Sequence, residues 1–287
     1  MILYSSELTT VETQYYLQHL IAPRPIALAS TTNAQGNVNL SPFSFFNMFS
    51  NRPPIVIFSP VRRIRNNTTK HTLENIVEVP EVAIHIVTYD IVHQTSLASC
   101  EYPKGTDEFI KAGFTKKQAS LIKPPLVAEA AAALECKVTE IKPLGNEGGA
   151  GQLVIAEVLC MHINDSLLSA DKKVHQQNLG HVARLGGNWY AKISASNLFS
   201  VEKPNTQLGI GFDALPEHIR NSEVLTGNHL AQLANVNVLP EKDGSFNEQI
   251  ENKYNLHSFA KSLIEEGNIH RAWQVLLCSV DPSRSLS

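Results

Sequence analysis

The sequence predicts a mainly β protein of the α+β class, with an antiparallel sheet, peripheral helices and a helical C-terminal part. Short apolar runs bounded by Pro, Gly and Asn recur through the first two thirds of the chain, as strands require. Two long β-type runs, residues 132–141 and 152–163, stand on each side of a glycine-rich stretch and predict a hairpin. From about Ser200 onward, apolar residues recur at helical spacing instead.

The N-terminal elements are expected in the order helix, strand, turn, strand. Residues Thr10–Leu20 predict a short helix that ends before Pro23. The apolar run 26–30 follows as a strand. A turn at residues 33–36, where Gly36 can adopt positive φ, then returns the chain as a hairpin.

The middle of the chain alternates strands with short helices. The expected elements are a strand at 55–59, a helix at 72–79, a strand at 82–88, and helices at 90–98 and 107–112. The glycine-rich stretch 143–151 joins the two long strands. Because a strand and not a helix follows it, we interpret it as a hairpin tip and not as a dinucleotide-binding loop.

The C-terminal part predicts helices at 215–221, 228–233 and 257–277, the last broken at Gly267 and Asn268. Its apolar residues look too sparse for a core of its own in fewer than ~90 residues. We therefore divide the chain into a domain of residues 1–199 and an extension of residues 200–287. The extension is expected to pack on that domain or on a second subunit, and an independent domain is the alternative.

The composition is that of an ordinary globular protein. Of 287 residues, 43% are hydrophobic and 18% are charged, and the net charge is −3 with a pI near 6.4. The chain therefore has no overall basic field for nucleic acid or membranes. The first residues lack a basic segment with a long apolar run, and no window reaches the ~20 apolar residues of a membrane span. We expect a cytoplasmic protein.

The sequence predicts neither a metal site nor a hydrolase motif. The four cysteines are far apart and have no C-x-x-C spacing, which predicts free thiols. Cys160 and His162 would share one face of a strand, but two ligands do not make a metal site. The H-E-x-x-H and G-x-S-x-G motifs are both absent.

Two segments carry polar chemistry. Residues 41–47, Ser-Pro-Phe-Ser-Phe-Phe-Asn, make a poor central strand, but they can hold backbone N–H groups beside aromatic rings, which suits a flat ligand with a polar edge. Four cations without an acid among them lead into the helix start at Thr72. They are Arg62, Arg63, Arg65 and Lys70. The residues alone leave open whether these cations and the helix start bind a phosphate or form a solvated basic turn.

Seven separated motifs occur in order along roughly residues 10–195. They are PRPIALAST from Pro23, PFSFFN from Pro42, PPIVIFSP from Pro53, KHTLENI from Lys70, DEF from Asp107, KPP from Lys123 and ARLGGNWY from Ala183. Each motif alone is weak. Together they resemble the flavin reductase-like family of FMN-binding split barrels, which includes flavoredoxin-type proteins.

The resemblance implies a closed antiparallel barrel of about six strands, of Greek-key type, in a homodimer that binds FMN at the subunit interface. The residues that it places along the flavin ring are Ser44, Phe45, Phe46 and Asn47. It places Ser59 near the ribityl chain. It places Lys70 and Thr72 at the phosphate, with Arg62 as their partner, and the family's usual acid after the lysine is His71 here. Arg184 and Tyr190 belong to the later motif and could come from the second subunit.

The function implied by the resemblance is flavin reduction. Hydride passes from NADH or NADPH to the flavin, and the electrons then pass to an unidentified small molecule or partner protein. Since no side chain needs to act as acid or base, no catalytic residue is predicted. The alternative is an FMN-binding electron carrier or sensor without NAD(P)H oxidase activity. A haem or pyridoxamine-phosphate protein fits less well, because the PFSFFN match belongs to the flavin branch.

Overall fold

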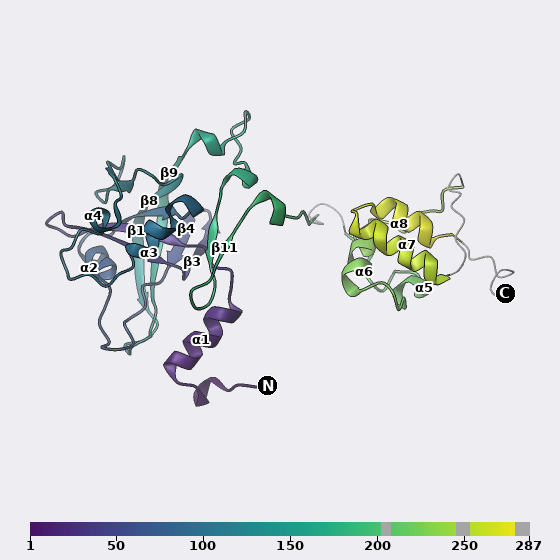
Figure 1. Cartoon of the computed structure of the whole chain (residues 1–287), viewed down its shortest axis with the longest axis horizontal. Helices are drawn as coiled ribbons and strands as arrows, with labels where there is room; N and C mark the ends of the chain where they lie inside the picture. Colours follow the sequence, from purple (N-terminus) through teal and green to yellow (C-terminus); the bar gives the residue numbers. More distant parts are fainter. Residues whose placement is uncertain (202–207, 245–252, 279–287) are drawn as a thin grey trace. The chain divides into compact units, whose positions relative to one another are not determined.

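The protein divides into two compact units, unit 1 (Met1–Phe199) and unit 2 (Ser200–Ser287). The computed structural model describes residues 1–201, 208–244 and 253–278, shown in colour in Figure 1. In these described ranges no helix has the length and apolar character needed to cross a membrane.

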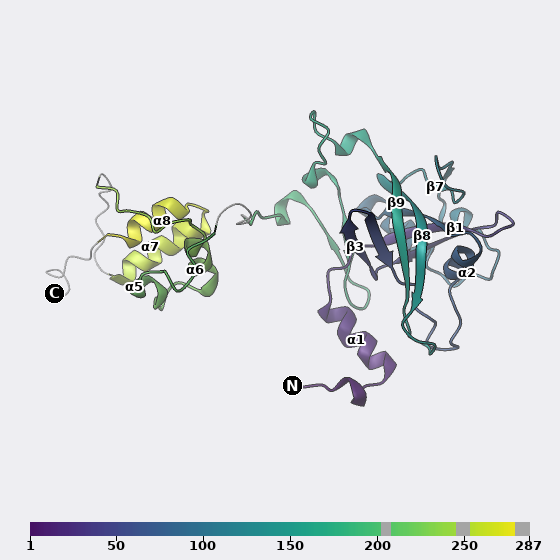
Figure 2. The ribbon, with the colours of Figure 1, turned by 180° about the vertical axis from the view of Figure 1, so that it is seen from behind.

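Unit 1 is built on a seven-stranded antiparallel sheet with the order β2-β1-β5-β8-β9-β4-β3. Figure 2 shows the two longest strands, β8 and β9, side by side. The strands are β1 (Ala27–Thr32), β2 (Val38–Phe43), β3 (Phe46–Asn51), β4 (Pro54–Phe58), β5 (Glu81–Ile86), β8 (Ala132–Pro143) and β9 (Gln152–Ile163). Two short ladders pair β6 (Lys116–Lys117) with β7 (Leu126–Val127), and β10 (Val182–Arg184) with β11 (Tyr190–Lys192).

The large sheet is open, so the expected closed barrel is wrong. Strands β2 and β3 are consecutive in the sequence but form opposite edges of the sheet. The chain leaves β2 after Phe43 and enters β3, which pairs with β4 instead of with β2. Pro42 in β2 has no N–H to donate, which fits an edge strand. The Greek-key type stays a prediction.

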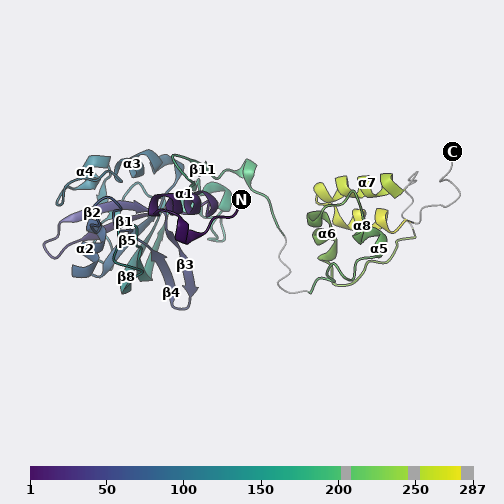
Figure 3. The same cartoon turned by 90° about the horizontal axis from the view of Figure 1, so that it is seen from below.

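Helices and turns surround the sheet, as Figure 3 shows from below. They are α1 (Thr10–Leu20), α2 (His71–Glu78), α3 (Val92–Leu97), α4 (Glu108–Ala112) and the 3₁₀ turns Ser5–Glu7, Tyr89–Ile91, Asp165–Leu167, Gln176–Asn178 and Ala195–Asn197. Helix α1 has the predicted bounds and begins with a capping box between Thr9 and Glu12. None of its residues is buried.

The core lies on both faces of β1. Every residue of β1 is buried. Ala27 and Ala29 belong to one apolar cluster, to which α2 contributes Ile76. Leu28 belongs to a second cluster, to which α4 contributes Phe109. Because successive side chains of a strand point to opposite faces, the helices on both sides of the sheet depend on this one strand.

Glycines at two turns explain two of the predicted hairpins. Gly36 has φ +84° in the turn between β1 and β2, as expected. The stretch 143–151 joins β8 to β9, so the predicted hairpin tip is confirmed. A Cβ on Gly148 would lie 2.8 Å from the carbonyl oxygen of Ile64, and one on Gly151 would lie 2.8 Å from Oγ of Ser59. This close packing accounts for the glycines without a nucleotide.

Unit 2 has a helical core of its own, so the expectation of too few apolar residues is wrong. Its helices are α5 (Glu217–Arg220), α6 (Gly227–Ala234), α7 (Lys253–Glu265) and α8 (Ile269–Leu276). Among the described residues of these helices and their connections, fourteen buried apolar side chains form one cluster. Trp273 lies within it, and its indole N–H donates to the carbonyl of Leu233 at 3.1 Å. The break is as predicted, with φ +79° at Gly267 and Asn268 as the N-cap of α8. Packing of this unit on unit 1 or on a second subunit stays a prediction.

Truncating Trp273 should unfold unit 2 selectively. The side chain is 1% exposed, and Trp273→Ala removes both its packing and its hydrogen bond. We expect a loss of about 3–5 kcal/mol in the free energy of unfolding of this unit. Urea unfolding followed by far-UV circular dichroism measures it. Val238→Ala, at a residue 73% exposed in the same unit, is the control and should change stability little. Equal midpoints for the two variants would contradict the observed core.

Candidate functional site

A polar pocket lies where three parts of the chain meet the segment 98–102. They are β2, the basic segment that contains Arg62, Arg63, Arg65 and Lys70, and the start of α2. Its lining includes Asn39, Ser41, Arg63, Lys70, Thr72 and Glu108. Lys70 and Thr72 are therefore the two predicted site residues that the structure brings together here. The lining also includes His71, whose pKa is lowered by burial, so that its imidazole is neutral at pH 7.

Three cations of the basic segment converge on one carboxylate. Nε of Arg63 lies 3.2 Å and Nζ of Lys70 lies 3.7 Å from Oε1 of Glu101, and Arg65 pairs with the other oxygen. Burial, followed by the charge of Arg63, lowers the pKa of Lys70. Glu101 is 31 positions from Lys70 in the sequence, so the segment that contained no acid acquires one through the fold.

The start of α2 borders this group of cations. Lys70 is the N-cap residue, and its side chain makes no capping hydrogen bond. The helix begins at His71, one residue before the predicted start. Thr72 is fully buried, and its hydroxyl donates to Oδ1 of Asn39 at 2.6 Å. The pocket therefore combines two cations with the positive end of a helix dipole.

Arg62 is half-buried and is not among the residues that line the pocket. Its guanidinium donates to Oδ1 and to the carbonyl oxygen of Asn67, both at 2.6 Å. Its backbone bonds to Gly149 and Ala150 at the tip of the β8–β9 hairpin. Arg63, the next residue, is the one that reaches Lys70. The sequence contained both arginines but gave no signal to distinguish them.

The segment predicted to contact a flavin ring spans the end of β2 and the start of β3. Phe45 is 41% exposed, and Phe46 packs against the core. Ser44 Oγ lies 3.4 Å from Nε of Arg24, and the side chain of Asn47 accepts from the N–H of the next residue. Ser59 donates its N–H to the carbonyl of Phe45 at 2.9 Å. The structure thus joins Phe45 and Ser59 through the backbone.

Ser59 is buried at the end of β4. Its hydroxyl oxygen accepts the N–H of Gln152 at 3.0 Å, at the start of β9. This contact uses the hydroxyl as an acceptor, so its proton is available to another group. Ser59 is not among the residues that line the Lys70 pocket.

Arg24 is a buried residue that the sequence analysis did not single out. Its guanidinium donates to the carbonyl oxygens of Gln18 and Ile21, both at 2.6 Å, and of Leu185 at 3.0 Å. Its backbone exchanges two hydrogen bonds with Arg184. Burial and the charge of Arg184 lower its pKa. Arg24 therefore ties the end of α1 to the β10–β11 hairpin and lies beside Ser44.

Arg184 and Tyr190 face each other across the β10–β11 hairpin. The guanidinium carbon of Arg184 lies 4.6 Å from the centre of the Tyr190 ring, and its Nη1 donates to the carbonyl of Trp189 at 3.0 Å. Gly186 in this hairpin lies under the ring of His19 from α1, so closely that a Cβ would clash. Helix α1 therefore packs against this hairpin. Their contact lies outside the Lys70 pocket.

The family is decided by a match along most of unit 1. Residues 20–178 match the family model of the flavin reductase like domain. The chain belongs to this flavin reductase-like family. A protein of Halalkalibacterium halodurans is 34% identical over 186 residues, which are 64% of this chain and 87% of that protein. The family match ends before the β10–β11 hairpin and before unit 2.

Solved structures support the same placement. Nitrilotriacetate monooxygenase component B from Bacillus cereus is 27% identical, with a TM-score of 0.65 over 70% of this chain and 98% of that one. A Shewanella frigidimarina protein described as a flavin reductase with a split barrel domain is 25% identical, with a TM-score of 0.60 over 71% and 99% of the two chains. Unit 1 thus resembles flavin reductase-like structures, one of which is described as a split barrel, while its own large sheet is open.

Removing Arg24 should destabilise unit 1. Arg24→Ala leaves three carbonyl groups without their charged donor, and we expect a loss of about 2–4 kcal/mol in the free energy of unfolding. Arg24→Lys should rescue it only in part, because an ammonium cannot reproduce the planar fork. Urea unfolding with thermal melts measures both. Arg52→Ala, at an exposed arginine, is the control, and an equal effect at both positions would show that Arg24 holds nothing in place.

Proposed function

We propose that this protein is an FMN-dependent oxidoreductase, in which hydride from NADH or NADPH reduces the flavin and the electrons pass to an acceptor outside this chain. Family membership supports a flavin-related oxidoreduction. One neighbour is by name a single component of a monooxygenase, which supports an acceptor that is a second protein.

The observation that carries the proposal is the meeting of Lys70 and Arg63 at the start of α2. Lys70 is partly withdrawn from water and repelled by Arg63, which is why its pKa is lowered. A phosphate dianion would relieve this repulsion, and it could also accept N–H groups of the first helical turn. The donor set therefore fits the phosphate of FMN, with Lys70, Arg63 and Thr72 at this end. Arg62 supports the turn through Asn67.

The other predicted residues fit the remaining parts of the cofactor. Phe45 offers an exposed aromatic face, while Arg24 beside Ser44 and the Phe45–Ser59 backbone bond fix the loop. We assign residues 44–47 to the flavin ring and the hydroxyl of Ser59 to the ribityl chain. These residues position the cofactor, and no acid or base is assigned.

A homodimer would complete the site. Helix α1 buries none of its residues, and it exposes Leu20 (77%) and Tyr15 (58%). The hairpin of β3 and β4 exposes Met48 (65%) and Phe49 (64%). Exposed apolar groups of this number on two elements indicate an interface. We propose that a second copy covers them and brings its Arg184 and Tyr190 to the FMN of the first.

Loss of Lys70 or Arg63 should weaken FMN but not riboflavin, which lacks the phosphate. One hydrogen bond to a charged group contributes about 1.5–3 kcal/mol, so Lys70→Ala and Arg63→Ala should each weaken FMN roughly ten- to a hundredfold. Fluorescence titration of the flavin-free protein with FMN and with riboflavin measures the two affinities.

Arg62→Ala is the matched comparison. Because Arg62 holds the turn through Asn67, this variant should lower the melting temperature and weaken both flavins by similar factors. Suppose that Arg62→Ala weakened FMN but not riboflavin, and that Arg63→Ala weakened neither. Arg62, and not Arg63, would then contact the phosphate. Unchanged FMN binding in all three variants would place the phosphate elsewhere.

A charge on the proposed interface should break the dimer. Phe49→Asp should convert a dimer into a monomer. It should also weaken FMN binding, since each monomer would keep only its own half of the shared site. Light scattering over a dilution series, run beside the FMN titration, measures both changes. Ile110→Asp, at a residue of α4 that is 76% exposed, is the control. A monomeric wild-type protein that binds FMN tightly would rule out the shared site.

Steady-state oxidation of NADH and NADPH tests the activity itself. The proposal expects turnover with FMN present, faster with one nicotinamide than with the other. Tight FMN binding without turnover of either nicotinamide would favour the electron carrier or sensor. Flavin absorption that survives desalting of the purified protein would show a bound cofactor and not a passing substrate.

A further inference from the structure

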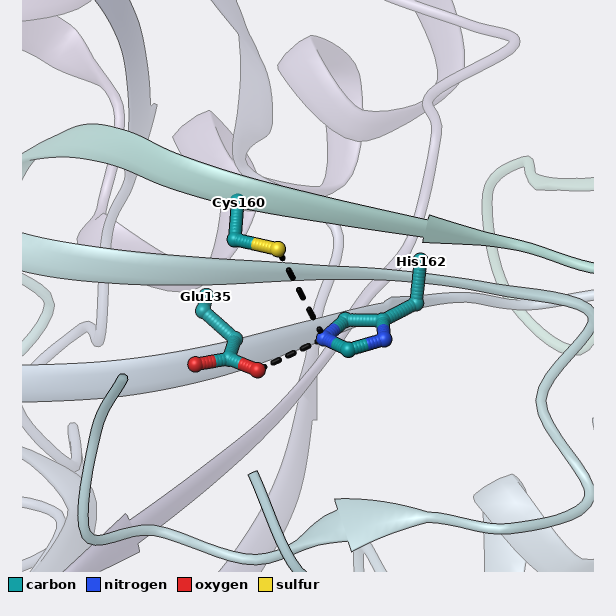
Figure 4. A group of neighbouring side chains, drawn as sticks. All are labelled: Glu135, Cys160 and His162. Atoms are coloured by element: carbon teal, nitrogen blue, oxygen red, sulfur yellow. Dashed lines mark hydrogen bonds and ion pairs between the residues drawn. The ribbon is translucent and has the colours of Figure 1, made fainter. Parts of the chain in front are cut away.

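A glutamate, a cysteine and a histidine meet where β8 pairs with β9. Glu135 on β8 lies directly opposite Cys160 on β9, and His162 follows two residues later on the same face. Nε2 of His162 lies 2.6 Å from Oε1 of Glu135 and 3.8 Å from Sγ of Cys160 (Figure 4). The three ligand atoms all lie within 4.8 Å of one another. In the described part of the chain no second group of three such side chains is this close.

Glu135 is held in place as a carboxylate. Its side chain is fully buried, and its two oxygens accept the N–H groups of Ser120 at 2.7 Å and Leu121 at 2.6 Å. A metal ligand must be deprotonated and oriented, and backbone donors of this kind orient metal-binding carboxylates.

Two groups converge on one nitrogen. The Nε2 atom of His162 can make one hydrogen bond, as a donor or as an acceptor. Its contact with the Glu135 carboxylate at 2.6 Å already uses this bond. Cys160 therefore gains only a weak contact at 3.8 Å from the same atom. One cation between the three side chains would engage all of them at once.

We propose that Glu135, Cys160 and His162 bind a single divalent ion of the zinc class. Tetrahedral zinc places its nitrogen and sulfur ligands about 3.6 Å apart, and its nitrogen and oxygen ligands about 3.4 Å apart. The sulfur–nitrogen distance already fits. The nitrogen–oxygen distance must open by about 0.8 Å, which the side chain of His162, 29% exposed, is free to do. This site is independent of the proposed flavin site.

The donor set selects the metal. A thiolate and an imidazole favour zinc and its neighbours over Mg²⁺ and Ca²⁺, which take oxygen ligands. One carboxylate and one thiolate neutralise two positive charges. Three protein ligands leave a fourth position for water on the exposed side of His162. The ion would join the β8–β9 hairpin to the segment 120–121 through Glu135.

Zinc titration of the full-length protein tests the site. The protein is stripped with a chelator, kept reduced, and titrated with Zn²⁺ against a chromophoric chelator. We expect one ion per chain and a rise in melting temperature. Co²⁺ in place of Zn²⁺ should add the charge-transfer absorption of a thiolate ligand, read as a difference spectrum. Binding well below one ion per chain, or cobalt without the thiolate band, would overturn the proposal.

Matched variants locate the ion. Cys160→Ser and His162→Ala should each weaken Zn²⁺ about 100-fold or more and abolish the metal-dependent rise in melting temperature. The controls are Cys100→Ser and His93→Ala, at an exposed thiol and an exposed imidazole, which should bind like wild type. Equal binding by Cys160→Ser and wild type would overturn the proposal.

The same variants separate this site from the flavin site and from the fold. Cys160→Ser should keep the wild-type affinity for FMN, so failure of one proposal leaves the other standing. Its melting temperature without metal should match that of metal-free wild type. If it melts lower, Cys160→Ala serves instead, because it removes the thiol ligand and, with it, only the weak contact at 3.8 Å. Zinc affinity unchanged in Cys160→Ala would also overturn the proposal.

Discussion

The burial of β1 on both faces is the constraint on which the rest of unit 1 depends. Ala27 and Leu28 face opposite apolar clusters, so a slip of one residue would exchange the two cores. The fixed register with β2 places Asn39 opposite Thr31, where it receives the hydroxyl of Thr72 and forms a wall of the pocket. Arg24, which precedes β1, is held instead by backbone carbonyls of Gln18, Ile21 and Leu185. Strand β1 thus positions Asn39 at the phosphate end of the proposed flavin site.

Local signals in the sequence were sufficient for several strands and turns, but they did not predict β3 or the short strands β6, β7, β10 and β11. The turn at Gly36, the β8–β9 hairpin and the break at Gly267 all follow from residue types that favour one backbone conformation. The open sheet could not be predicted in this way. Whether β2 and β3 pair with each other and close a barrel depends on how far the sheet opens. The core of unit 2 was missed since short helices such as α6 supply few apolar residues each, and they form a cluster only when they pack together.

The site was less predictable because its contacts join distant segments. Arg62 and Arg63 are adjacent, yet Arg62 hydrogen-bonds to Asn67, whereas Arg63 lines the same pocket as Lys70. A guanidinium binds a backbone carbonyl as readily as an anion, so composition cannot separate the two roles. The contacts of Glu135 could not be predicted from the sequence either. The alternation of Cys160 and His162 was visible in the sequence, but the acid opposite them depends on the register of β8 with β9.

The pocket contains two acids, and their surroundings decide which one an anion would displace. Glu108 is 3% exposed, burial raises its pKa, and it accepts the N–H of Leu40 at 3.0 Å, so it is part of the wall. Glu101 has a side chain 36% exposed and pairs with three cations. Of these pairs the one with Arg65 is the most exposed, and exposed pairs contribute little stability, whereas Arg63 is only 14% exposed. In the proposed function, a phosphate would therefore take the place of the Glu101 carboxylate beside Arg63 and Lys70 and leave Glu108 in the wall.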